Sequence, residues 1–151
     1  MRMGSDDETD SRRFFREQGG NYQVYRPTYP AALAAALAAL TPTAGRALDV
    51  GCGSGQLTVL LAAHFSEAVG VDPSESQLSH AGTRDNIRYL CACAESLPLA
   101  DSSVNLVVAA QAAHWFDLPR FYAAVRRVAR DQAVIALISY GVPQLADPLN
   151  A

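Results

Sequence analysis

Short apolar runs alternate with helical patterns through the middle of the chain. The apolar runs predict strands at 47–50, 67–72, 87–91, 104–109 and 133–138, and 3.6-residue periodicity predicts helices at 31–40, 56–63, 74–81 and 118–129. Strands that are apolar almost throughout are typical of a parallel sheet covered on both faces. The alternation therefore predicts an α/β fold with a doubly wound, mostly parallel sheet and right-handed crossovers.

Two of these predicted helices have apolar residues gathered on one face. In the helix at 118–129, Phe121, Val125 and Val128 fall on the inward side, with Asp117 as a plausible N-cap. Its outward arginines are Arg120, Arg126, Arg127 and Arg130. The alanine- and leucine-rich helix at 31–40 places Leu33, Leu37 and Leu40 on one face.

The residues 47–55 form the stretch around which the chain is organised. An apolar run containing Asp49 ends in glycines at alternate positions, Gly51, Gly53 and Gly55, and a helical pattern follows at once. A strand, a tight glycine turn and a helix N-terminus form the entrance to a nucleotide site, because glycine allows positive φ and close approach of a ligand. Asp72 ends the next strand, where a carboxylate can accept both ribose hydroxyls of an adenosine cofactor.

The glycine spacing distinguishes between adenosine cofactors. Dinucleotide sites use G-x-G-x-x-G, whereas this chain has G-x-G-x-G, with Gln56 at the position of the third glycine of that fingerprint. The spacing disfavours a nicotinamide-dependent oxidoreductase. Asp49, the glycines and Asp72 together also argue against a glycine turn that binds nothing.

The stretch 48–55, Leu-Asp-Val-Gly-Cys-Gly-Ser-Gly, resembles the first motif of the class I S-adenosylmethionine (SAM) methyltransferases. The resemblance implies a Rossmann-like sheet of strand order 3-2-1-4-5 and SAM as cofactor, with S-adenosylhomocysteine as its product. It also implies a set of cofactor-binding residues: Asp49, Gly51, Cys52, Gly53, Asp72, Pro73, Ala94, Glu95 and Gln111. Within it the glycine loop would hold the methionine part, Asp72 the ribose, and the loop at 94–95 the adenine. Many relatives carry an acidic residue where this chain has Cys93.

Two further stretches, 22–30 and 111–117, resemble a methyltransferase subgroup that includes trans-aconitate methyltransferase. That resemblance implies a small-molecule methyl acceptor, in some relatives a carboxylate. It makes His114, Tyr22 and Arg26 the candidate catalytic residues, with Arg26 able to pair with a substrate carboxylate. For His114 a purely structural role is an equal alternative, and Trp115 and Phe116 are more typical of core than of a substrate wall.

The composition of the chain argues against several kinds of binding partner. Half of the 151 residues are hydrophobic and the net charge is −3, which argues against a nucleic-acid surface. No apolar run approaches the ~20 residues that span a bilayer, and the acidic first ten residues are unlike a signal peptide, so we expect a cytoplasmic protein. The three cysteines, Cys52, Cys91 and Cys93, match no disulfide or metal framework, and we expect buried, inert thiols and no metal.

The domain expectation is a mobile tail at 1–13 followed by one SAM-binding methyltransferase domain at 14–151. Compared with the family, that domain would be truncated, because the helix and antiparallel hairpin expected after the fifth strand are missing. The strand at 133–138 would then be an apolar edge that invites a homodimer. Two hypotheses for function follow: a SAM-dependent methyltransferase, or a truncated module that binds SAM or S-adenosylhomocysteine without turnover.

Overall fold

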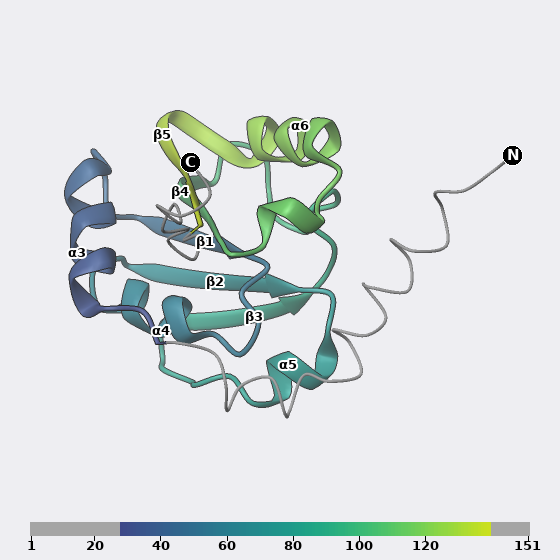
Figure 1. Cartoon of the computed structure of the whole chain (residues 1–151). Helices are drawn as coiled ribbons and strands as arrows, with labels where there is room; N and C mark the ends of the chain where they lie inside the picture. The colour runs from purple at the N-terminus through teal and green to yellow at the C-terminus, as the bar shows by residue number, and fades with distance from the viewer. Residues whose placement is uncertain (1–27, 140–151) are drawn as a thin grey trace, which may run out of the picture.

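A computed structural model describes residues 28–139 of the chain. Its five strands are β1 (Arg46–Val50), β2 (Glu67–Asp72), β3 (Ile87–Cys91), β4 (Val104–Ala110) and β5 (Ala129–Ile138). All neighbouring strands run parallel, in the order β3-β2-β1-β4-β5 (Figure 1). The predicted fold class and strand order are confirmed.

Helices cover both faces of this sheet. On one side lie α3 (Ala31–Leu40) and α4 (Gln56–Ala62), and on the other lies α6 (Leu118–Val128) (Figure 1). The short helix α5 (Glu75–Ser79) follows β2, and a 3-10 turn, η1 (Ala113–Trp115), precedes α6. The arrangement is a three-layer, doubly wound sandwich.

The core is divided by the sheet into two clusters. Alternate residues of β1 serve opposite faces: Leu48 and Val50 pack with the inward face of α6, whereas Ala47 packs with α3 and α4. The predicted inward residues of α6, namely Phe121, Val125 and Val128, are all fully buried. Asp117 caps that helix, its carboxylate accepting a hydrogen bond from the Arg120 N–H. The central strands are therefore covered on both faces, as their uninterrupted apolar sequences predict.

In α3, Ala34 and Leu37 are buried in the core, whereas Leu40 is 68% exposed. The bounds of two other elements differ from their predictions. The helix predicted at 74–81 is shorter, since Ser74 is its N-cap and the last helical residue is Ser79. The fifth strand begins at Ala129, directly after α6, and reaches its regular pairing with β4 only after a register shift.

Among residues 28–139, no helix is long and apolar enough to cross a membrane. The expected tail at 1–13 and the candidate residues Tyr22 and Arg26 lie outside the described residues. The division into a tail and a single domain at 14–151 thus stays a prediction.

Candidate cofactor site

The candidate site lies at the carboxyl edge of the sheet, between β1 and β4. The chain leaves β1 toward β2 and β3 on one side, and later returns to β4 and β5 on the other. In open parallel sheets, ligands bind in the crevice where the strand order reverses in this way. Gly51 directly follows β1 and Gln111 directly follows β4, so both lie at that reversal.

The glycine loop has the left-handed backbone that its sequence predicts. The φ angles are +71° at Gly51, +56° at Gly53 and +76° at Gly55, a region that side chains disfavour. A Cβ on Gly51 would also stand 2.6 Å from the Cβ of Ala112. These glycines therefore allow a loop that turns sharply and packs closely against the segment after β4.

Backbone N–H groups of this loop are used within the protein. Those of Gly51 and Cys52 both donate to the carbonyl of Val71, at 2.8 and 3.0 Å. The Gly53 N–H donates to Asp72 Oδ2 at 2.9 Å, and the Gly55 N–H to the Cys52 carbonyl at 3.0 Å. A phosphate-binding loop needs such donors to face its ligand. This loop is better suited to a ligand that donates to backbone carbonyls.

Asp72 joins the glycine loop to the turn after β2. Its Oδ2 accepts from Gly53 and its Oδ1 accepts from the Ser74 N–H at 2.8 Å, while the Ser74 hydroxyl caps α5. A carboxylate has about four acceptor positions, so one carboxylate can accept from several donors at once. Asp72 is thus fixed in place at the end of β2, where the sequence predicts a ribose contact.

Asp49 lies beneath the loop rather than at its surface. The residue is 2% exposed, and its Oδ2 accepts a 2.8 Å hydrogen bond from the hydroxyl of Thr58, which is itself fully buried. This bond connects β1 to α4 on either side of the glycine turn. The role of Asp49 in the cofactor site stays a prediction, and Thr58 is a partner of Asp49 that the sequence pattern did not single out.

Cys52 and Tyr89 fill the space under the same loop. Burial, followed by the nearby carboxylates of Asp49 and Asp72, raises the pKa of the Cys52 thiol well above its ordinary value. Burial also raises the pKa of Tyr89 to about 12, with smaller contributions from Cys52 and Asp49. Both groups are therefore neutral near pH 7, and Cys52 is a packing residue rather than a nucleophile.

Two glutamine side chains beside the loop have buried polar atoms that lack a partner in the described part of the chain. They are Oε1 of Gln56, at the start of α4, and Nε2 of Gln111. Gln111 also has a left-handed backbone, with φ of +57°, and its N–H donates to the Ile138 carbonyl. An unsatisfied acceptor and an unsatisfied donor are costly to bury, and a water molecule or a bound ligand would satisfy either atom.

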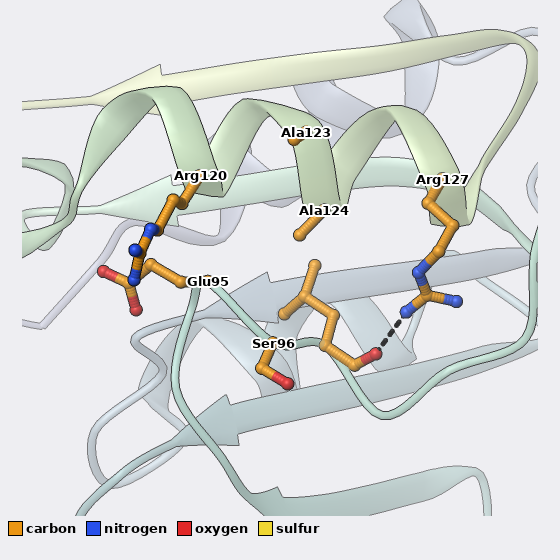
Figure 2. A pocket seen from close by; sticks show the side chains of 7 residues that line it. Glu95, Ser96, Arg120, Ala123, Ala124 and Arg127 are labelled. Atoms are coloured by element: carbon orange, nitrogen blue, oxygen red, sulfur yellow. Dashed lines mark hydrogen bonds between the residues drawn. The ribbon is translucent and has the colours of Figure 1, made fainter.

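The loop after β3 is held against α6. Oε1 of Glu95 accepts a 2.9 Å hydrogen bond from the Asp117 N–H, so this carboxylate is directed to the start of α6, while Ala94 is 6% exposed. Between loop and helix lies a pocket of about 350 Å³, whose walls are residues 95–97 and, on α6, Arg120, Ala123, Ala124 and Arg127 (Figure 2).

The remaining residues singled out from the sequence differ in how exposed their side chains are. His114 is exposed on η1, with its ring 4.8 Å from that of Trp115. Pro73 is also exposed, and its carbonyl is 3.5 Å from the Cys91 sulfur. The expectation of buried thiols holds for Cys52 but is wrong for Cys91 and Cys93, which are exposed because β3 is an edge strand of the described sheet. In residues 28–139 no three histidine, cysteine or acidic side chains gather into a possible metal site.

The fold is a doubly wound α/β sheet with a glycine loop at its carboxyl edge, and comparison with known proteins gives the family. Residues 48–137 match the family described as "Methyltransferase domain", so the chain belongs to that family. The match contains the last three residues of β1, the glycine loop, β2 to β4 and most of β5.

Individual proteins similar to this chain are also named as methyltransferases. A Dictyostelium discoideum protein provisionally named a methyltransferase is 38% identical over 132 residues, covering 87% of this chain and 50% of that protein. The Saccharomyces cerevisiae protein CRG1, named a probable S-adenosylmethionine-dependent methyltransferase, is 31% identical over 139 residues, covering 86% and 48%. A solved structure from Anaeromyxobacter dehalogenans, provisionally titled a type II methyltransferase, is 45% identical with a TM-score of 0.74, covering 83% and 53%. The chain thus spans about half the length of these relatives.

Proposed function

We propose that this chain binds S-adenosylmethionine and transfers its methyl group to a small-molecule acceptor. Membership of the methyltransferase family supports the activity. The observation that carries the choice of cofactor is the glycine loop, whose N–H groups at Gly51, Cys52 and Gly53 already have acceptors within the protein. The carbonyls of such a loop suit the ammonium group of an amino acid better than its donors suit a pyrophosphate.

The described residues fit this cofactor. Its methionine part is a zwitterion, which offers donors and acceptors to the unpartnered amides of Gln56 and Gln111. Asp72, which the Gly53 and Ser74 N–H groups hold at the end of β2, would accept hydrogen bonds from the ribose hydroxyls. The expected contacts of Pro73 and of the Ala94 amide with the nucleoside belong to the same proposal. Glu95 would act on the adenine side mainly by holding its loop to α6.

The cofactor supplies a methyl group already activated by a sulfonium. The protein's task is then to hold the acceptor in line, and orientation of this kind supplies roughly 7–11 kcal/mol in favourable cases. We propose His114 as a hydrogen-bond partner or base for the methyl acceptor, since it is exposed on the segment that follows Gln111. Tyr22 and Arg26 would close over the acceptor, and Arg26 would pair with its carboxylate where the acceptor has one.

Calorimetric titration with S-adenosylmethionine, S-adenosylhomocysteine and NAD tests the cofactor. We expect micromolar binding of the first two compounds and none of NAD. Asp72→Asn should weaken S-adenosylhomocysteine binding about 10- to 100-fold, the equivalent of one or two hydrogen bonds to a charged group. Asp85→Asn is the matched control, because that carboxylate is exposed and lies in the turn before β3, at the edge of the sheet opposite the glycine loop.

The ribose contact can be separated from the loop contact. In the wild-type protein, 2′-deoxy-S-adenosylhomocysteine should bind more weakly than the parent compound. In Asp72→Asn this difference should shrink, because the acceptor of the 2′-hydroxyl has changed. An unchanged difference would assign Asp72 to the support of Gly53 and Ser74 alone, and would remove it from the proposed cofactor contacts.

A second candidate is a module that holds S-adenosylmethionine or S-adenosylhomocysteine without turnover. The chain spans about half the length of its relatives, so binding and turnover are tested separately. Release of S-adenosylhomocysteine in the presence of a panel of small carboxylates and other nucleophiles would support the enzyme. Tight binding with no product from any acceptor would favour the module.

We also propose that the chain self-associates through β5. This strand is an edge of the described sheet, and its side chains Ile135 and Leu137 are 46% and 44% exposed. Parallel edges with exposed apolar side chains invite pairing with a second strand. Sedimentation should show a dimer that Ile135→Lys weakens, whereas a wild-type monomer at high concentration would refute the proposal.

A further inference from the structure

Arg127 connects α6 to the loop that follows β3. Its Nη2 donates to the Leu97 carbonyl (Figure 2). Its Nη1 donates to the Leu99 carbonyl and to Asp101, both at 2.8 Å. The carbonyl of Arg127 in turn accepts from the Ser102 N–H at 2.9 Å. One residue thus makes four hydrogen bonds to the segment 97–102.

The two carbonyls held by Arg127 bracket a tight turn. The Leu99 N–H donates to the Leu97 carbonyl across Pro98, which makes this a three-residue turn. Both leucine side chains are buried in the cluster beneath α6. A guanidinium can bond both carbonyls at once because its donors form a rigid, planar fork, whereas a lysine ammonium is a single point.

The same loop is tied to α6 at its other end, through Glu95 and the Asp117 N–H. The pocket of about 350 Å³ lies between these two attachments (Figure 2). The loop therefore takes its position from two polar attachments together with the packing of Leu97 and Leu99 beneath α6. The ion pair with Asp101 adds little, since that carboxylate is 78% exposed.

We infer that Arg127 is a positioning residue for nucleobase recognition, and this inference rests on the proposed function. A cofactor whose ribose lies at Asp72 extends its base away from β1, toward the carboxyl end of β3, and hence toward residues 92–97. Hydrogen-bonding atoms of that backbone select a base only if they are held in place. Arg127 holds them from the far side of the loop without touching the cofactor.

Affinity for two nucleosides tests this role. S-Inosylhomocysteine differs from S-adenosylhomocysteine at the base, where a ring carbonyl and N–H replace the 6-amino group and its neighbouring acceptor. We expect the wild-type protein to prefer the adenine compound at least tenfold, and Arg127→Lys to reduce that preference about three- to tenfold, the equivalent of one hydrogen bond. Arg126→Lys is the matched control, as Arg126 is the preceding, exposed arginine of α6, and it should leave the preference unchanged.

Amide hydrogen exchange provides a readout that needs no ligand. The N–H groups of Ser96 and Leu99 donate within the loop, so both should exchange faster in Arg127→Lys, while the Gly51 and Cys52 amides keep their wild-type rates. Equal acceleration at all four amides, or an equal loss of affinity for both nucleosides, would make Arg127 a residue of general stability and overturn the inference. A wild-type chain that binds neither nucleoside would refute the proposed function itself, and the inference with it.

Discussion

Gly70 lies in the middle of β2 and makes room for Tyr89 and Cys52. A Cβ built on it would stand 2.7 and 2.8 Å from Cδ1 and Cε1 of Tyr89, and 2.9 Å from the sulfur of Cys52. Ordinary contacts begin near 3.4 Å, so the overlap amounts to several tenths of an ångström at three atoms. Its backbone is not left-handed, unlike that of Gly51, so only space requires glycine here. Gly70→Ala therefore isolates the packing beneath the glycine loop.

The expected cost is the difference between two effects. Overfilling a packed site costs about 1–3 kcal/mol. Alanine in place of a strand glycine returns about 0.5–1 kcal/mol, because the unfolded chain loses less entropy on folding. We expect Gly70→Ala to lower the free energy of unfolding by about 0.5–2 kcal/mol. The cost of overfilling exceeds the gain from replacing glycine, because the Tyr89 ring cannot move away freely while its hydroxyl donates to the Gly82 carbonyl at 2.6 Å.

Urea unfolding followed by circular dichroism measures this difference, and a double-mutant cycle assigns it. In a Tyr89→Ala background two of the three overlaps disappear, so Gly70→Ala should cost less than half as much, or become stabilising. Gly82→Ala is the control, because its Cβ would meet a single methyl of Val59, at 3.0 Å. The same cost in both backgrounds, or no cost in the wild type, would refute the packing argument.

Three further outcomes test the support of the site. Folding raises the pKa of Tyr89 to about 12, because the buried site favours the neutral phenol. The contribution of this phenol to folding stability is therefore complete below the unfolded pKa near 10 and is lost as the pH rises toward 12. The urea midpoint of Tyr89→Phe should accordingly fall less over that range than the wild-type midpoint. Thr58→Val removes a hydroxyl from the buried Asp49 carboxylate and should lower the free energy of unfolding by about 1.5–3 kcal/mol, whereas Thr58→Ser should retain most of it. Ser74→Ala removes the cap of α5 and should cost about 1 kcal/mol, measured in the same urea experiment.

The pattern of apolar residues was sufficient for the sheet and for most element bounds. Strands covered on both faces have continuous apolar sequences, and the helix at 31–40 and the strand at 87–91 match their predicted bounds. The predictions were weakest where an element ends. The start of β5 could not be predicted, because residues 129–132 are polar or small and join the sheet through a register shift beside β4.

The site was predictable where backbone conformation requires one residue type. Alternate glycines and a terminal aspartate give the loop and Asp72 directly, since left-handed φ and a carboxylate at a strand end leave marks in the sequence. Tyr89 and Thr58 leave no such mark, because each acts through contacts with residues distant in the chain. Gly70 is the one available signal: a glycine inside an apolar strand indicates the close approach of another group.

These supports explain how the glycine loop can keep one shape before any cofactor arrives. From below, Thr58 bonds Asp49 and the Tyr89 ring packs against Gly55 and Gly70. From the side, the Asp72 carboxylate accepts from the Gly53 N–H, and the Val71 carbonyl accepts from the N–H groups of Gly51 and Cys52. A loop fixed at each of these points loses little conformational freedom on binding, so less of the interaction energy is consumed in ordering it. The cost is that substitutions beneath the loop, which never contact the cofactor, should lower its affinity.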